Sequence, residues 1–310
     1  MNTNFSEVTV LVIGDMMLDK YIYDSLNRTS PEADVPVVLE LNENVYAGGA
    51  ANVAMNVNAL GAKVIPVGIV GNDMSSSALI SLLRKENIDT GSIVKSDSVH
   101  TTTKKRIFIN DKQYIRLDRD SSISDDRIYD LLCVEIENNI KKSDVIIISD
   151  YNKGVVSKNI CQFTINLANK MDIPVVVDPK KEKFDYYSRA TAITPNLDEA
   201  SLVANTKNID ELIFFFQKEI DRINVDYFLL KLGKEGIILI KKNETKKFVA
   251  REVKYPDVTG AGDTVISTLS LMIAVGNKIE SCVEYANIAA GKVVEKKETA
   301  FITKKEIFNL

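Results

Sequence analysis

Residues 256–275 read PDVTGAGDTVISTLSLMIAV. Here Gly260, Ala261 and Gly262 have small or absent side chains, so their backbone N–H groups can approach an anion closely. An apolar run of helical period follows at once, and the N-terminal end of a helix carries partial positive charge. The stretch therefore predicts a turn and a helix that hold a phosphoryl group by its oxygens.

The acid at this turn, Asp263, would repel a bound phosphate if that were its only role. Its position becomes favourable if a substrate hydroxyl lies between the carboxylate and the phosphoryl group. The carboxylate can then accept the hydroxyl proton while the oxygen attacks the phosphorus. The plainer alternative is an aspartate that caps the helix after a glycine turn, and these residues alone leave both interpretations open.

The composition is that of an ordinary globular protein. The chain has 310 residues, of which 45% are hydrophobic and 26% charged, and its net charge at pH 7 is −4. That length suits one large α/β domain or two small ones. A nucleic-acid binder usually carries a basic excess, so we expect no nucleic-acid partner.

Cysteine and histidine usage disfavours several kinds of site. Cys133, Cys161 and Cys282 stand far apart without a CxxC pair, which favours reduced thiols. His100 is the only histidine, which argues against zinc and against mechanisms that need a second His. The N-terminus does not read as a signal peptide, and no apolar run approaches the ~20 residues of a membrane span. We therefore expect a cytoplasmic protein with no membrane partner.

Short apolar runs alternate with segments of helical period along most of the chain. The expected strands are 8–14, 63–71, 145–149, 174–177, 192–194 and 227–232, with a hairpin-like pair at 237–241 and 247–251. The expected helices are 49–60, 76–86, 124–141, 159–170, 198–204, 209–223, 262–275 and 279–295, with a last turn after 303. This alternation predicts an α/β fold with a mainly parallel sheet and helices on both faces. Ligands bind such sheets beyond the C-terminal ends of the strands.

Two segments, about 16–38 and 98–118, fit that sheet poorly. Residues 35–41 read as extended, with a proline that suggests an edge position. Residues 101–110 and 113–118 read as a β-hairpin around Asp111 and Lys112, with polar residues on one face. We expect one domain over residues 1–310 with a small β-lid made by the two segments.

Two further motifs suit a sugar. In YAGGAANVAM (46–55), Gly48 and Gly49 can bring the backbone against a sugar while Asn52 reaches its hydroxyls. The alternative is a tight turn into a close-packed helix. In GDMMLD (14–19), Asp15 and Asp19 come just past the first strand, where carboxylates accept hydrogen bonds from sugar hydroxyls, although a solvated loop explains them equally well.

Two motifs suit a nucleotide. In TPNLDE (194–199), Asn196 and Glu199 share a helix face, and Glu199 can organise a hydrated Mg²⁺. The alternative is a capping box at the start of that helix. The turn KLGKEG (231–236) suits close approach of a nucleotide, and the chain contains neither GxxxxGK[ST] nor GxGxxG.

This set of motifs resembles the ribokinase-like (PfkB) carbohydrate kinases. The resemblance rests on GGAANVA near residue 50 and DVTGAGDT near residue 260, with TPNLDE and KLGKEG between them, and it covers essentially the whole chain. It implies the ribokinase-like three-layer fold. A closer similarity, through RTSPEADVPVV, QYIRLD, SDYNKG and VVVDPK, is to the bacterial kinases that phosphorylate D-glycero-D-manno-heptose 7-phosphate at C1 for ADP-heptose and lipopolysaccharide core synthesis. In many bacteria that kinase is fused to a nucleotidyltransferase domain.

The resemblance also implies roles for individual residues. Asp263 is the general base on the anomeric hydroxyl, and residues 260–262 form the anion hole. The implied sugar ligands are Asp15, Asp19, Gly48, Gly49 and Asn52. The implied ATP contacts are Asn196, Glu199, Lys231, Gly233, Gly236 and Asn287, with Mg²⁺ bound at Glu199 through water. Whether a monovalent cation assists is left open.

The substrate of these kinases carries a distal phosphate, and the chain offers cations for it: Lys104, Arg106, Lys153 and Lys180. A solvated surface charge is the alternative for each, and Asp150 is a further candidate sugar contact. The resemblance also suggests a homodimer through the lid. Two other functions stay open: a related kinase for another sugar or sugar phosphate, and a sensor that kept the fold without catalysis.

Overall fold

The computed structural model describes residues 1–24, 28–39, 43–110, 112–121, 123, 126–180, 182–254, 256–296 and 299–308. Within these residues, a nine-stranded sheet has the order β15-β14-β13-β12-β11-β10-β1-β6-β7. Every neighbouring pair from β13 to β7 is parallel, and β14 and β15 continue the sheet as antiparallel strands. The strands are β1 (Thr9–Gly14), β6 (Lys63–Gly71), β7 (Ile93–Ser96), β10 (Val145–Ser149), β11 (Val175–Asp178), β12 (Ala192–Ile193), β13 (Tyr227–Lys231), β14 (Ile237–Ile240) and β15 (Thr245–Phe248).

The central strands are apolar on both faces because helices cover both sides of the sheet. Along β1, Val10 and Val12 belong to one buried cluster, whereas Leu11 and Ile13 belong to another on the opposite face. A strand buried on both sides reads as a continuous apolar run, and this is why VTVLVIG was recognisable in the sequence.

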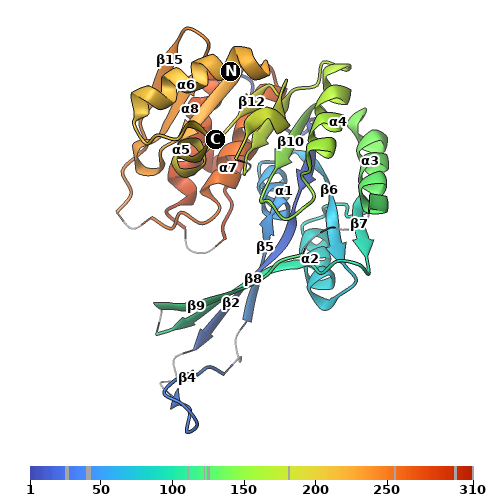
Figure 1. Ribbon diagram of the computed structural model, residues 1–310, viewed down its shortest axis with the longest axis vertical. Helices are drawn as coiled ribbons and strands as arrows, with labels where there is room; N and C mark the ends of the chain where they lie inside the picture. The colour runs from blue at the N-terminus through green and yellow to red at the C-terminus, as the bar shows by residue number, and fades with distance from the viewer. Residues whose placement is uncertain are drawn as a thin grey trace.

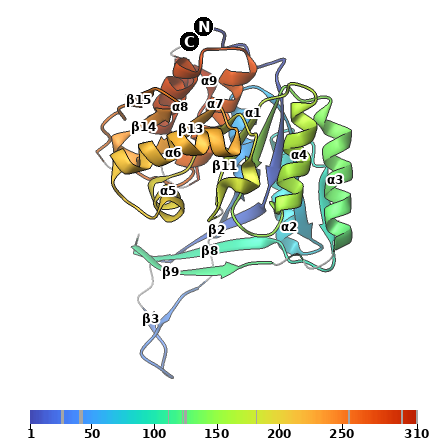
Figure 2. The same ribbon diagram turned by 45° about the horizontal axis from the view of Figure 1, so that its top comes forward.

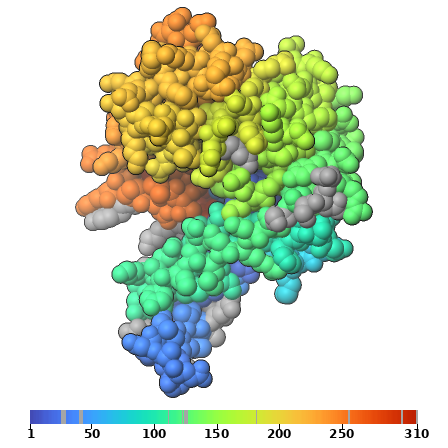
Figure 3. Space-filling view, viewed as in Figure 1, coloured from blue at the N-terminus to red at the C-terminus, as the bar shows by residue number. Residues whose placement is uncertain are grey.

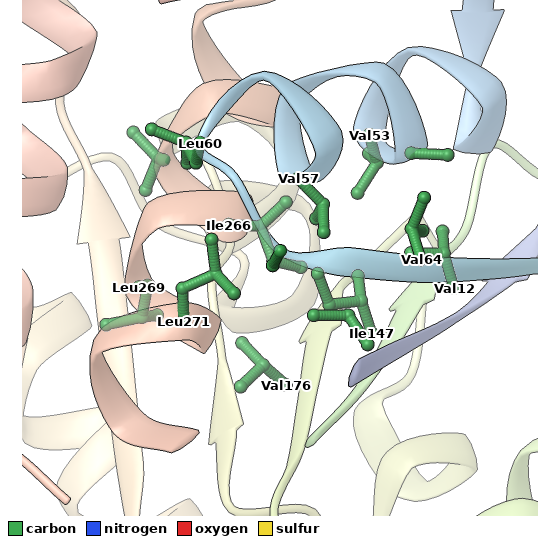
Figure 4. Packing of buried hydrophobic residues seen from close by; sticks show 14 of the residues in the cluster. Val12, Val53, Val57, Leu60, Val64, Ile147, Val176, Ile266, Leu269 and Leu271 are labelled. Carbon is green, nitrogen blue, oxygen red and sulfur yellow. The ribbon is translucent and has the colours of Figure 1, made fainter. Parts of the chain in front are cut away.

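Helices α1 (Ala50–Ala59), α2 (Met74–Lys85), α7 (Ala261–Ala274), α8 (Ile279–Val293) and α9 (Lys304–Phe308) contribute to the first cluster. Helices α3 (Asp126–Ile140), α4 (Lys158–Asn169), α5 (Leu197–Ala204) and α6 (Ile209–Ile223) contribute to the second, together with the short turn η1 (Phe184–Tyr187). Figure 4 shows Val57 of α1 and Ile266 of α7 beside Ile147 of the sheet. The three-layer α/β fold predicted from the sequence is confirmed (Figures 1 and 2).

A second, smaller sheet projects from the body of the molecule (Figures 1 and 3). Its order is β5 (Glu43–Gly49), β2 (Met16–Asp24), β8 (Thr102–Ile109), β9 (Lys112–Arg119). β2 pairs with β5 antiparallel and with β8 parallel, and β8 pairs with β9 antiparallel. We call these four strands the projecting sheet. Two very short strands, β3 (Arg28–Thr29) and β4 (Pro36–Val37), form a separate hairpin.

Several expectations differ from the structure. Residues 35–41 do not form one extended edge strand: only Pro36–Val37 is a strand, and 40–41 lie outside the described residues. The sequence analysis missed β7 and β5, and β5 reads ENVYAGG, whose asparagine and glycines have low strand propensity. Its strand conformation comes from pairing with β2, which places Met16 opposite Gly49. Most other expected boundaries of helices and strands differ from the observed ones by one or two residues. The expected turn residue 111 and the expected helix start at 124 lie outside the described residues.

The direction of strand order reverses at β1. From β1 the chain proceeds through β6 to β7 on one side, and from β10 through β11 to β13 on the other. Ligands of open parallel sheets bind beyond the strand ends at such a reversal. Asp15 and Asp150 directly follow β1 and β10, so both lie at this place. In the part of the chain that the structure describes, no helix is both long and apolar enough to cross a membrane.

Candidate active site

The centre of the candidate site is the carboxylate of Asp263 in the first turn of α7. The side chain is 5% exposed, and its two oxygens accept hydrogen bonds from two different segments of the chain. Tyr151 Oη donates to Oδ1 at 2.6 Å, and Asn52 Nδ2 donates to Oδ2 at 2.6 Å. The helix begins with Gly260 as its N-cap and has no side-chain cap. The helix-capping alternative for Asp263 is therefore wrong.

Gly260 is required at this turn by its backbone conformation. Its φ is 75°, in the left-handed region that side chains disfavour. A Cβ atom there would also lie 3.1 Å from Asn52 Nδ2, the atom that donates to Asp263. The glycine thus allows the turn before α7 and leaves room for the amide that holds the carboxylate.

An ion pair lies beside the same turn. Lys231, the last residue of β13, pairs with Asp178, the last residue of β11, and both side chains are about 15% exposed. A Cβ on Gly262 would lie 3.5 Å from Lys231 Nζ, so the ammonium group sits against the first turn of α7. The positive end of α7 and the half-buried Lys231 ammonium together suit a phosphoryl group, although the Ala261 N–H already donates to the Val258 carbonyl at 3.2 Å.

The surroundings of Asp263 set its protonation. The pKa of the carboxyl is raised to about 6, mainly by burial, and the charge of Asp178 acts in the same direction. The hydrogen bonds from Tyr151 and Asn52 and the charge of Lys231 act in the opposite direction. A carboxyl with a pKa near 6 is mostly ionised at neutral pH and is a stronger base than a solvated aspartate.

A second group of predicted residues meets on the projecting sheet. Asp19 lies within β2 rather than in a loop, directly opposite Lys104 of β8. Arg106 Nη1 lies 3.3 Å from Asp19 Oδ1, and neither atom has a hydrogen-bond partner among the described residues. Gly48 is needed here because a Cβ atom would lie 3.1 Å from the Asp19 carboxyl carbon. Burial raises the pKa of Asp19 and lowers that of Lys104, so both groups are held away from water.

Asp15 shapes the loop that follows β10. Its Oδ2 accepts the backbone N–H groups of Tyr151 and Lys153 at 2.9 and 3.1 Å, and its Oδ1 accepts that of Val155 at 3.0 Å. In the same loop, Asp150 accepts a hydrogen bond from the hydroxyl of Tyr187 at 2.7 Å. Contacts of both acids with sugar hydroxyls stay predictions, and the structure adds that they fix the loop carrying Tyr151.

A third group surrounds the start of α5. Asn196 and Glu199 form a capping box: Asn196 Oδ1 accepts Glu199 N, and Glu199 Oε2 accepts Asn196 N, each at 2.9 Å. Asn196 also pairs with Lys231 in a parallel β-bridge, which places this helix start next to the ion pair. The capping alternative is confirmed, and a capping carboxylate can still face a ligand with its other oxygen.

That other oxygen, Glu199 Oε1, accepts a hydrogen bond from Lys180 Nζ at 3.0 Å. Lys180 therefore lies beside a residue predicted to contact ATP, and its own contact with the distal phosphate of the sugar stays a prediction. Within the described residues no cluster of three or more His, Cys, Asp or Glu side chains could hold a metal ion. A single, partly exposed carboxylate fits a Mg²⁺ ion that keeps its waters and binds mainly to ATP phosphates.

The remaining nucleotide-side predictions are less well connected. Gly233 and Gly236 lie in the turn after β13, both with positive φ. Asn287 of α8 donates from Nδ2 to the carbonyl oxygen of Val249 at 2.8 Å, and no hydrogen bond among the described residues joins it to the groups around Asp263. Contacts of these three residues with ATP stay predictions.

The sequence analysis missed two residues of the site, Tyr151 and Asp178. Both stood at or next to the ends of expected strands, in SDYNKG and VVVDPK. The end of a parallel strand was the available signal, because polar residues there face the ligand edge of the sheet. Asn52 was identified, but its amide contacts Asp263, a partner that spacing could not reveal.

The fold and the geometry of the site suit a phosphotransferase that activates a hydroxyl. The chain belongs to the pfkB family of carbohydrate kinases, whose sequence pattern matches residues 8–306. It is therefore an ATP-dependent sugar kinase. The match confirms the family predicted from GGAANVA and DVTGAGDT.

Curated relatives carry one recurring name. The chain is 38% identical to "Bifunctional protein HldE" of Koribacter versatilis over 99% of its length and 63% of that protein. It is 39% identical to "Bifunctional protein HldE" of Haemophilus influenzae strain PittEE over 99% of its length and 64% of that protein. The chain thus spans less than two thirds of the length of these curated relatives.

Solved structures confirm the ribokinase-like fold. Phosphofructokinase-2 of Escherichia coli in a tetrameric inhibited form superposes with a TM-score of 0.79 at 18% identity, over 97% of each chain. Ribokinase of Arabidopsis thaliana complexed with ribose and ATP superposes with a TM-score of 0.77 at 17% identity, again over 97% of each chain.

Proposed function

We propose that the chain transfers the γ-phosphoryl group of ATP to the anomeric C1 hydroxyl of D-glycero-D-manno-heptose 7-phosphate. The product is heptose 1,7-bisphosphate, and we place it in the cytoplasmic synthesis of ADP-heptose for lipopolysaccharide core. The similarity to the HldE proteins supports this substrate. The observation that carries the proposal is a group of cations next to Tyr151, whose hydroxyl donates a hydrogen bond to the candidate base Asp263.

That group, which we call the cation group, consists of Lys104, Arg106 and Lys153. Lys104 Nζ lies 5.3 Å from the centre of the Tyr151 ring, and the Tyr151 hydroxyl reaches Asp263. The charges of Arg106 and Lys153 disfavour the Lys104 ammonium, and Asp19 and Asp118 favour it. Arg106 is itself paired with Asp19, and Lys153 with Asp120. A phosphate dianion would add negative charge beside these cations and would accept a hydrogen bond from Arg106 Nη1, which is ion-paired with Asp19 but donates no hydrogen bond among the described residues.

In the proposed reaction, Asp263 accepts the proton of the C1 hydroxyl while the oxygen of that hydroxyl attacks the γ-phosphorus. The bond between that phosphorus and the β,γ-bridging oxygen breaks, and ADP leaves with the electron pair. Backbone N–H groups of Gly260 and Gly262 and the Lys231 ammonium stabilise the charge on the transferred group. The Ala261 N–H can join them if it leaves the Val258 carbonyl. Mg²⁺ bound at Glu199 through water would neutralise part of the ATP charge.

The first prediction concerns substrate choice. The value of kcat/KM for heptose 7-phosphate is expected to exceed that for the unphosphorylated heptose by about 10²-fold or more, because two or three charged hydrogen bonds are lost without the phosphate. A Lys104→Met variant is expected to raise KM for the phosphorylated sugar about tenfold while leaving turnover of the unphosphorylated one within about twofold. The measurement is a coupled ADP assay over a panel of sugars, with phosphorus NMR of the product to identify the phosphorylated carbon and anomer.

Lys105→Met is the matched control, since neighbouring residues of a strand point to opposite faces. Lys105→Met should leave KM and turnover unchanged for both substrates. Equal turnover of ribose or fructose without a phosphate would reject heptose 7-phosphate as the substrate and favour a kinase for another sugar.

We also propose that the chain is a single kinase domain whose segments 16–38 and 98–118 act as a lid and form a homodimer. β9 is the outer strand of the projecting sheet, and its backbone edge has no strand beside it among the described residues. It exposes Tyr114 by 62% and Leu117 by 50%. Exposed apolar side chains on an unpaired edge are typical of a surface that pairs with another chain.

The second prediction tests this pairing. The wild-type protein is expected to sediment as a dimer at micromolar concentration, and Leu117→Lys is expected to sediment as a monomer, because a charge at the centre of an apolar contact opposes association. Analytical ultracentrifugation measures both. Leu202→Lys is the control: this leucine on α5 is also exposed, by 62%, and its replacement should leave the dimer intact. A monomeric wild-type protein would refute the dimer.

A further inference from the structure

Tyr151 connects the two ends of the candidate site. Its backbone N–H donates to Asp15, its ring lies under Lys104, and its hydroxyl donates to Asp263. The hydrogen bond to Asp263 is 2.6 Å long, as short as that from Asn52. The Tyr151 side chain therefore contacts both Lys104 of the cation group and the Asp263 carboxylate.

Two donors on two different oxygens fix the orientation of a carboxylate. Tyr151 occupies one position on Oδ1 and Asn52 one on Oδ2, so rotation of the Asp263 carboxylate about its Cβ–Cγ bond would break both contacts. Each carboxylate oxygen has a second lone pair, and a substrate hydroxyl can donate to it while the protein contacts remain. The two donors therefore aim the base without occupying all of its accepting positions.

We propose that Tyr151 is a positioning residue for the proton transfer: its hydroxyl, with the amide of Asn52, holds the Asp263 carboxylate in the orientation that accepts the sugar hydroxyl proton. The inference rests on the proposed role of Asp263 as the base. It assigns a function to a tyrosine that neither forms the anion hole nor belongs to the cation group.

The anchoring of Tyr151 supports this role. Asp15 holds the backbone of residues 151, 153 and 155 by three hydrogen bonds, so the tyrosine is fixed to the end of β1. Burial and the nearby charge of Asp263 raise the pKa of the Tyr151 phenol well above its usual value. The phenol therefore stays protonated at neutral pH and acts as a hydrogen-bond donor.

Four groups face the Asp263 carboxylate, each from a different element: Asn52 of α1, Tyr151 after β10, Asp178 of β11 and Lys231 of β13. Only Asp178 favours the protonated form; the other three favour the ionised form. Removing the hydroxyl of Tyr151 should therefore shift the pKa of Asp263 upward.

The third prediction is the corresponding experiment. In wild type, kcat/KM should fall on the acid side with an apparent pKa near 6, the value that its buried surroundings give Asp263. Tyr151→Phe is expected to move that acidic limb to higher pH by about one unit and to lower kcat about tenfold at its optimum, with KM for ATP within about twofold. The assay uses whichever sugar phosphate the wild-type protein turns over best.

Tyr129→Phe is the matched control, because the Tyr129 hydroxyl donates to the Gly154 carbonyl at 3.2 Å in the same loop without touching Asp263. It should leave the acidic limb unchanged. If Tyr151→Phe leaves the acidic limb at its wild-type position, the inference is overturned. Should Tyr151→Phe not fold, Tyr151→Met is measured in its place and judged by the same criterion. This outcome can be told apart from a failure of the proposed function. An active Asp263→Asn variant would refute the role of Asp263 as the base. If Asp263→Asn is inactive but Tyr151→Phe leaves the acidic limb of kcat/KM unmoved, only the role of Tyr151 is refuted.

Discussion

Replacing Asp263 with asparagine is expected to lower kcat by about 10²–10⁴-fold. The amide keeps the size of the side chain but cannot accept the hydroxyl proton at neutral pH. KM for ATP should change by less than about threefold, because in the proposed site the phosphates are held by backbone N–H groups and Lys231 and not by Asp263. Steady-state kinetics with a saturating sugar phosphate, at several ATP concentrations, measure both parameters.

The control for this variant is Asp210→Asn. Asp210 is an exposed aspartate in the first turn of α6, so it matches Asp263 in residue type and helix position but not in burial. Its replacement should leave kcat unchanged. A rate near that of wild type for Asp263→Asn would contradict the base assignment and with it the proposed mechanism. A protein that bound ATP without any turnover, even as wild type, would instead be a sensor.

The sequence was informative wherever local chemistry determines the structure. Continuous apolar runs such as VIIIS and VTVLVIG predicted the buried parallel strands, since only strands covered on both faces have that pattern. The small residues and the apolar run after them predicted a helix from 262, one residue from the start of α7, and Gly260 before it has the φ of 75° that favours glycine. These features are encoded within a few residues, so no knowledge of the fold was needed to recognise them.

Features that depend on distant residues could not be predicted in the same way. Strand β5 forms because β2 pairs with it, although its own residues are poor strand formers. The hydrogen bond from Asn52 to Asp263 joins residues 211 positions apart, and that from Tyr151 joins residues 112 apart. Residue types suggested the members of the site, but only the sheet order determines which of them meet.

One motif carried two interpretations that sequence alone cannot separate. Asn196 and Glu199 were open to a capping box or to a role at the ATP phosphates, and the structure shows the capping box. The same geometry leaves Glu199 Oε1 facing Lys180, away from the helix backbone. A spacing of three residues suits both roles because both place the side chains on one side of a helix start.

The last prediction concerns Lys231, whose replacement by methionine is expected to lower kcat by about 10²–10³-fold, as for removal of one donor from a site that stabilises transition-state charge. The ammonium lies against the first turn of α7, where the transferred phosphoryl group would gather negative charge. Lys234→Met, in the same KLGKEG turn but exposed, is the control and should keep wild-type activity.

The ion pair between Lys231 and Asp178 allows a sharper test, because its two members shift the pKa of Asp263 in opposite directions. Lys231 lowers the pKa of Asp263 and Asp178 raises it. Lys231→Met should therefore move the acidic limb of kcat/KM to higher pH, and Asp178→Asn should move it to lower pH. Both variants break the same contact, so a loss of structure alone would shift the two limbs in the same direction or not at all. Opposite shifts, measured from pH 5 to pH 8 with one substrate, would show that charge beside the first turn of α7 controls the base, and parallel shifts would refute that coupling.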